Sequence, residues 1–64
     1  MAQTKLKEVR QAAGLSQRQL AEKAGISVRT LQHWETGERD LMKAAVMTVL
    51  ALAEALGCDI NDIL

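Results

Sequence analysis

The segment over residues 16–37 constrains the fold more than any other part of this chain. It carries two short helical patterns that are separated only by Gly25, Ile26 and Ser27. A short turn that contains glycine joins two helices at a steep angle instead of laying them side by side. Gly25 suits such a turn because it lacks the Cβ that disfavours a left-handed backbone. The segment therefore predicts a helix-turn-helix unit.

Helical patterns also flank this unit. Apolar residues recur at three- and four-residue spacing, and glycine follows four of the patterns, where helices commonly end. Alternating apolar and polar residues, which indicate strands, are missing. A chain of 64 residues has room for one domain. We therefore expect one compact, all-α, five-helix domain over residues 1–64, with an extended fourth helix and a short fifth. The predicted helices lie at about 4–13, 17–24, 28–35, 41–56 and 60–64.

The third predicted helix has an apolar side and a polar side. Leu31 and Trp34 stand three residues apart and are expected to hold it against the core. The polar side then faces outward, and the major groove of B-DNA admits one such helix. Arginine pairs with guanine, glutamine pairs with adenine, and an apolar side chain contacts the thymine methyl group. The predicted base-reading residues are Val28, Arg29, Gln32 and His33.

Short polar side chains surround this face. Hydroxyl and amide groups, together with the backbone N–H groups at helix starts, are suitable donors to phosphate. Arg39 lies just past the third predicted helix, where a phosphate contact and full solvation are both open. The predicted phosphate-contacting residues are Ser16, Gln17, Ser27, Thr30, Thr36 and Arg39.

A set of residues at fixed spacing runs through the same segment. Its members are Leu15-Ser16-Gln17, Leu20-Ala21, Gly25-Ile26-Ser27, Leu31, Trp34-Glu35 and Gly37. With these residues the chain resembles the XRE family of lambdoid repressor and Cro proteins. The resemblance implies a five-helix domain that reads DNA with its third helix, usually as a dimer on a palindrome. It places a phosphate clamp on Gln17 and Thr36 and base reading on the four residues named above.

The resemblance also pairs Arg10 of the first predicted helix with Glu35 at the end of the third. A partly buried pair would fix one helix against the other. Two exposed charges would contribute only about 0–1 kcal/mol. Both interpretations of these residues are open from the sequence.

The fourth predicted helix is apolar on more than one face. The spacing from Gly37 to Gly57 is about one helical turn longer than in the shorter phage repressors, so their dimer geometry is not assumed. A helix that is apolar beyond one face is usually buried on more than one face. The alternative is scattered apolar residues, which are common on protein surfaces. The predicted dimer patch consists of Val46, Met47, Leu50, Ile63 and Leu64.

Charge and cysteine content narrow the function classes. The net charge is zero, but residues 1–39 hold seven basic and four acidic side chains (+3), and residues 40–64 hold one and four (−3). This uneven distribution permits one face to approach phosphate. The single cysteine, Cys58, can build neither a disulfide within the chain nor a zinc site, which favours a reducing setting. We expect Cys58 to be a packed small hydrophobe and not a redox sensor.

Several function classes are not expected. The sequence has no phosphate-binding loop, metal-ligand spacing or pairing of nucleophile and base, so we expect no catalytic residue, metal or cofactor, and hence no enzyme. There is no pattern of a signal peptide, and the apolar stretch over 41–56 is interrupted and short for a bilayer. We expect a bacterial or phage-encoded protein of the cytoplasm, associated with the nucleoid when bound and without a membrane partner.

The sequence thus predicts sequence-specific binding of double-stranded DNA by a transcriptional regulator. We expect a homodimer that represses by occupying its operator. The alternative is a protein-interaction module, or an antitoxin-type domain that binds a protein partner, because the fold does not fix the function. The apolar fourth helix favours the alternative, and the polar face of the third helix favours DNA.

Overall fold

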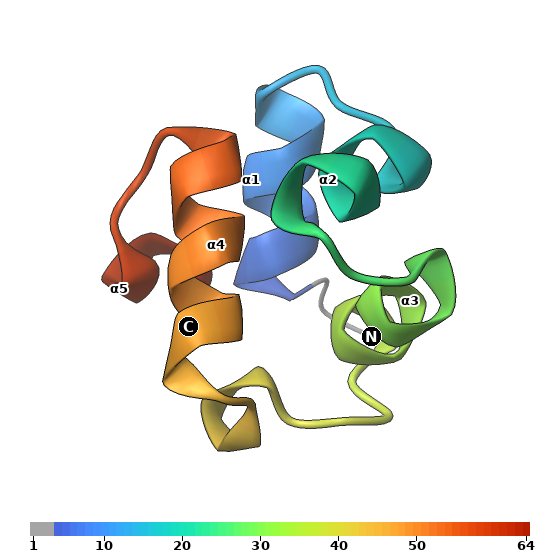
Figure 1. Cartoon of the computed structure of the whole chain (residues 1–64), viewed down its shortest axis with the longest axis vertical. Coiled ribbons are helices and arrows are strands. Elements are labelled where there is room, and N and C mark those ends of the chain that lie inside the picture. Colours follow the sequence, from blue (N-terminus) through green and yellow to red (C-terminus); the bar gives the residue numbers. More distant parts are fainter. Residues whose placement is uncertain (1–3) are drawn as a thin grey trace.

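The computed structural model describes residues 4–64 and contains helices but no strand within that range. The α-helices are α1 (Lys5–Ala12), α2 (Gln17–Ala24), α3 (Val28–Thr36), α4 (Val46–Leu56) and α5 (Ile60–Ile63), and a 3-10 turn, η1 (Leu41–Lys43), precedes α4. In Figure 1, α4 and α5 lie on one side of the molecule, and α3 lies on the other. The prediction of an all-α, five-helix domain is confirmed.

Short polar side chains start the first three helices. Thr4, Ser16 and Ser27 each accept a hydrogen bond from the backbone N–H group three residues later. Each cap satisfies a donor that the start of a helix leaves without a partner, which stabilises a helix by about 1 kcal/mol. Gly25 ends α2 with a φ of 72°, in the left-handed region that favours glycine. These local features fix the turn between α2 and α3.

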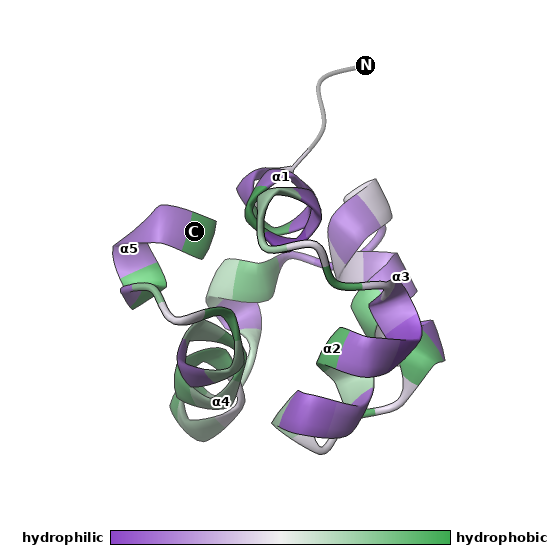
Figure 2. Ribbon diagram, turned by 90° about the horizontal axis from the view of Figure 1, so that it is seen from above, coloured by the Kyte–Doolittle hydropathy of each residue, from purple (hydrophilic) through white to green (hydrophobic). Residues whose placement is uncertain are grey.

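The core gathers one leucine from each of the first four α-helices. Leu6, Leu20, Leu31 and Leu52 are at most 1% exposed. Full burial of such a side chain stabilises the fold by about 1.5–3 kcal/mol. Trp34 is 7% exposed and belongs to the same cluster, so its predicted core position is confirmed. Figure 2 shows α4 as hydrophobic over most of its length, whereas α1, α2 and α3 alternate hydrophobic with hydrophilic segments.

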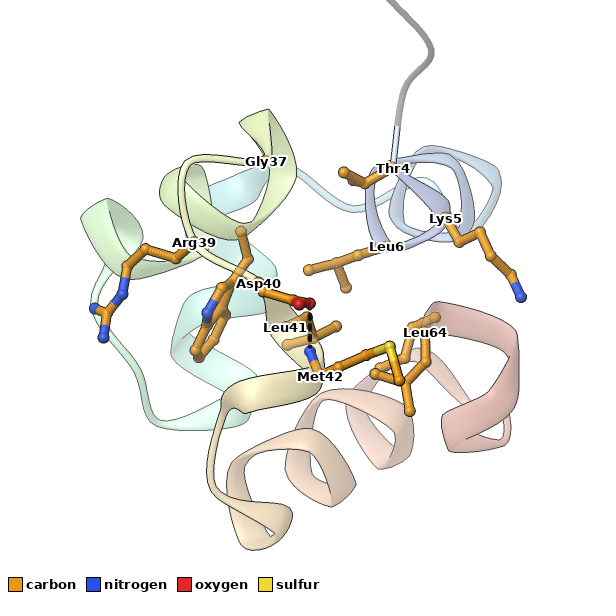
Figure 3. Close-up of a pocket in the computed structure, with 11 residues that line it drawn as sticks. Thr4, Lys5, Leu6, Gly37, Arg39, Asp40, Leu41, Met42 and Leu64 are labelled. Carbon is orange, nitrogen blue, oxygen red and sulfur yellow. Dashed lines mark hydrogen bonds between the residues drawn. The ribbon is translucent and has the colours of Figure 1, made fainter.

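The fourth helix is shorter than the predicted range of 41–56. The structure has the 3-10 turn η1, then two extended residues, Ala44 and Ala45, and α4 starts only at Val46. Asp40 caps η1 by accepting a hydrogen bond from the N–H of Met42 at 3.0 Å, and Leu41 points into the interior beside Leu6 (Figure 3). The prediction of a continuous helix was wrong. These residues are good helix formers, but propensity is a weak preference that a local cap and tertiary packing override.

The predicted dimer patch needs a second correction. Ile63 is only 3% exposed, because α5 folds back against α1 and α4 and turns this side chain into the core. Its assignment to the patch was wrong. The other four predicted residues lie at the surface, and Met42 joins them. We call this set the apolar patch: Met42 (71% exposed), Val46 (69%), Met47 (76%), Leu50 (38%) and Leu64 (38%).

None of the helices in residues 4–64 has the length and the apolar character needed to cross a membrane.

We predict that Leu31→Ala unfolds most of the protein. The substitution removes a fully buried side chain, which costs about 2–5 kcal/mol, whereas the core of so small a domain rarely supplies more than about 3–5 kcal/mol. The measurement is urea denaturation followed by circular dichroism. Gln11→Ala is the control, because Gln11 is exposed on α1 and lies outside both the core and the apolar patch, and its midpoint should stay near the wild-type value. Equal midpoints for the two variants would contradict the packing described here.

Candidate nucleic-acid interface

Helix α3 presents a polar side to solvent because its other side is anchored in the core. Leu31 and Trp34 hold the buried side. The predicted base-reading residues occupy the opposite side: Arg29 and Gln32 are exposed, and Val28 and His33 are half-buried. A side chain can reach a base edge only when it is accessible. Arg29 and Gln32 meet that condition in full, and Val28 and His33 meet it in part.

The predicted phosphate-contacting hydroxyls differ in availability. The hydroxyl of Ser27 donates to Thr30 Oγ1 at 2.8 Å, and that of Thr36 donates to a backbone carbonyl of α3 at 3.2 Å. Ser16 caps α2 as an acceptor, so its own proton stays available, as does that of Thr30. Arg39 is exposed at the end of α3. Ser27 and Thr36 would have to exchange a partner before they could donate to phosphate.

Charged side chains around this face are mixed in sign. Arg18, Arg29 and Arg39 are exposed and can attract phosphate. The carboxylate of Glu38 lies 3.8 Å from Nε2 of His33, and the two attract each other only when the imidazole is protonated. The exposed arginines of this face thus stand beside the exposed carboxylate of Glu38.

A buried ion pair supports α3 from below. Arg10 Nε donates to Glu35 Oε2 at 2.7 Å, and Nη2 donates to Oε1 at 3.2 Å. Their side chains are only 10% and 1% exposed. Nη1 of Arg10 also donates to the carbonyl oxygen of Leu15 at 2.8 Å. Of the two interpretations open from the sequence, the structure has the buried pair, which fixes α1 against α3.

Two contacts of Glu35 had no signal in the sequence patterns. Gln17 Nε2 donates to Glu35 Oε1 at 3.0 Å, and Thr4 Oγ1 donates to the backbone carbonyl of Glu35 at 3.3 Å. The sequence predicts a phosphate contact for Gln17, but it does not predict that Gln17 lies beside a buried carboxylate. The partners are 18 and 31 residues apart in the sequence. Helical periodicity describes neighbours three or four residues apart and cannot find such pairs.

Cys58 packs against the core at the end of α4. Burial raises the pKa of its thiol, and the nearby carboxylates of Asp62 and Asp59 raise it further. Because the thiolate is the reactive form of cysteine, these surroundings make the thiol less reactive. Both observations agree with the expected role as a small packed side chain.

The fold and this face together define a helix-turn-helix protein that binds DNA. Residues 6–63 match the family described as "Helix-turn-helix", and the chain belongs to this family in its XRE-type form. The chain is also similar to the restriction-modification controller protein C.AhdI from Aeromonas hydrophila. The two are 32% identical with a TM-score of 0.82, over 94% of this chain and 86% of that one. A comparison with curated proteins gives no significant match. The protein is a DNA-binding transcriptional regulator.

We predict that Arg10→Met unfolds much of the protein. The substitution leaves the buried carboxylate of Glu35 without its counter-charge, and breaking such a pair costs about 3–5 kcal/mol. Thermal and urea denaturation, followed by circular dichroism, measure the loss. Arg18→Met is the control, because Arg18 is an exposed arginine on α2.

The double variant Arg10→Met/Glu35→Leu should regain part of the lost stability, since neither charge then stays buried alone. If Arg10→Met had the denaturation midpoint of Arg18→Met, the ion pair would not support the fold.

Proposed function

We propose that this regulator reads a specific duplex sequence with the outer side of α3 and represses transcription by occupying its operator in the cytoplasm. The observation that carries this proposal is the division of α3 into an anchored apolar side and an exposed polar side. An α-helix held in this way fits the major groove, while the preceding helix crosses the DNA backbone. The buried ion pair supports the proposal because it holds α3 firmly while the polar side remains open.

Each side chain of the outer side has a proposed partner. Arg29 donates two hydrogen bonds to a guanine, and Gln32 pairs with adenine. Val28 contacts a thymine methyl group, and His33 donates to a purine edge. The proposed phosphate contacts are those of Ser16, Gln17, Ser27, Thr30, Thr36 and Arg39, together with the N–H groups that start α2 and α3.

We further propose that the protein acts as a homodimer joined through the apolar patch. A second copy is the occupant that fits best, because two-fold symmetry places two recognition helices about one DNA turn apart. The patch lies on η1, α4 and the end of α5, while α3 lies across the fold (Figure 1). A copy bound there leaves the outer side of α3 free for DNA.

A second candidate function is control of a restriction–modification system. The similarity to C.AhdI favours it. This role is compatible with sequence-specific binding. The position of the operator in the genome distinguishes it from other regulatory roles. An operator upstream of restriction and methylation genes supports it, and an operator elsewhere contradicts it.

We predict that selection from a randomised duplex library enriches a palindrome with half-sites about one helical turn apart. The measurement is sequencing of the retained duplexes at low and moderate salt. Arg29→Ala should still enrich the site but lose the preference at one position per half-site, a loss of about 1–3 kcal/mol. Lys23→Ala serves as a control, since Lys23 is exposed on α2 and has no proposed DNA contact. Retention without any enriched sequence would contradict specific readout, and no retention would favour the protein-interaction module.

We predict that Leu50→Glu and Met47→Glu lower the sedimentation mass from that of a dimer to that of a monomer and leave the circular dichroism spectrum unchanged. A carboxylate buried against an apolar partner surface loses its hydration without gaining a partner. Gln11→Glu is the matched control, because it adds the same charge at an exposed position of α1. A wild-type protein that sediments as a monomer at every concentration and on DNA would contradict the dimer.

A further inference from the structure

Two methionines of the apolar patch have side chains that are open to solvent. Met42 on η1 is 71% exposed and Met47 on α4 is 76% exposed, the two largest values among the exposed large apolar residues of the described part of the chain. The third methionine, Met1, lies outside the described residues. Two-electron oxidants convert the thioether of methionine to a sulfoxide. An oxidant dissolved in water can reach both Met42 and Met47.

The other sulfur and indole side chains within residues 4–64 are less open to such an oxidant. Trp34 is 7% exposed and belongs to the core. Cys58 is half-buried, and burial together with two nearby carboxylates raises the pKa of its thiol. The thiolate is the form of cysteine that reacts with peroxide. Cys58 is therefore a weak competitor for the oxidant.

The reaction with hydrogen peroxide needs no further reagent. A lone pair of the methionine sulfur attacks one peroxide oxygen, so a sulfur–oxygen bond forms and the oxygen–oxygen bond breaks. The departing hydroxide takes the proton of the new sulfur-bound hydroxyl and becomes water. The sulfur loses the two electrons that reduce the peroxide, and the products are one methionine sulfoxide and one water.

The surroundings of the two methionines decide what a sulfoxide does there. Met42 and Leu64 line a hollow in which every lining residue is apolar, and Figure 3 shows both side chains. Met47 stands one helical turn before Leu50 on α4. A sulfoxide oxygen accepts hydrogen bonds, but the side chains of Val46, Leu50 and Leu64 have no donor to offer. Apolar surface pressed against such an oxygen leaves it without a partner, which is unfavourable.

We propose that Met42 and Met47 are oxidation sites, and that their conversion to sulfoxides by a peroxide separates the two copies of the proposed homodimer. The proposal rests on the homodimer and adds a reversible control of its patch, because methionine sulfoxide reductases restore the thioether. Neither residue belongs to the core cluster. The folded domain therefore tolerates the added oxygen atoms, and the effect falls on the association of two copies.

Peptide mass spectrometry after treatment with hydrogen peroxide tests the two sites. Met42 and Met47 should each gain one oxygen before Cys58 or Trp34 is modified. Both rates should fall as the protein concentration rises, because a second copy covers the patch. Free methionine in the same solution is the reference, and its rate should not depend on the protein concentration. Oxidation of Cys58 before the two methionines, or rates that stay constant while the protein dimerises, would overturn the proposal.

Sedimentation of the wild type before and after complete oxidation tests the effect on association. The dissociation constant of the dimer should rise by about 10- to 100-fold, while the circular dichroism spectrum stays unchanged. Treatment with methionine sulfoxide reductases A and B, one for each sulfoxide epimer, should restore the original constant. An unchanged dissociation constant after oxidation, or a loss of association that the reductases do not reverse, would contradict the proposed effect.

The double variant Met42→Leu/Met47→Leu assigns the effect to these two residues. Its dissociation constant before peroxide serves as its own reference, and peroxide should not change that constant. The variant keeps Cys58 and Met1, so a dimer of the variant that still separates in peroxide would assign the effect to another residue. If the variant does not dimerise, reversal by the reductases in the wild type decides.

The failure of the homodimer can be recognised separately. A wild-type protein that is a monomer before oxidation overturns both the dimer and the proposed effect on association. The order in which Met42, Met47 and Cys58 are oxidised still decides whether the two methionines are the oxidation sites.

Discussion

The contact between Arg10 and Glu35 is the interaction on which the rest of this structure depends. Removing two charges from water is costly, and the cost is offset only when the geometry is good and the remaining polar atoms find partners. Both conditions are met, because the guanidinium makes two bonds to the carboxylate and a third to the carbonyl of Leu15. Gln17 adds a donor to Glu35. One buried pair thereby joins α1, the loop after it, α2 and α3.

Helix α3 is held from two sides by different forces. Leu31 and Trp34 attach it through apolar packing, which is strong but not directional. Glu35 attaches its last turn through hydrogen bonds, which are directional. The apolar packing keeps α3 on the domain, and the hydrogen bonds of Glu35 set the rotation of the helix about its own axis. A helix fixed in both respects presents its outer side chains in one arrangement, and such preorganisation reduces the entropy that the proposed binding to DNA would lose.

The segment between α3 and α4 is shaped by a helix cap and by extended backbone, and not by a buried ion pair. Asp40 starts a 3-10 turn, and the extended residues Ala44 and Ala45 redirect the chain before α4. This break leaves Met42 at the surface near Val46, while Leu41 enters the core. The apolar patch therefore arises from the break in the helix as much as from α4 itself. We propose this patch as the surface that binds a second copy of the chain.

The sequence by itself determined the elements that depend on near neighbours. Ser16, Ser27 and Gly25 mark helix ends because a cap or a left-handed turn is a local matter, and Leu31 and Trp34 belong to the core by their spacing. The fixed spacing of the family residues also directed attention to α3 and to Arg10 with Glu35. Tertiary structure alone decided that Leu41 enters the core while Met42 stays at the surface, that Ile63 is buried, and that Gln17 joins Glu35 to Gln32. These features arise between residues far apart in the chain, and the free energies that select them belong to the packed domain and not to any one segment.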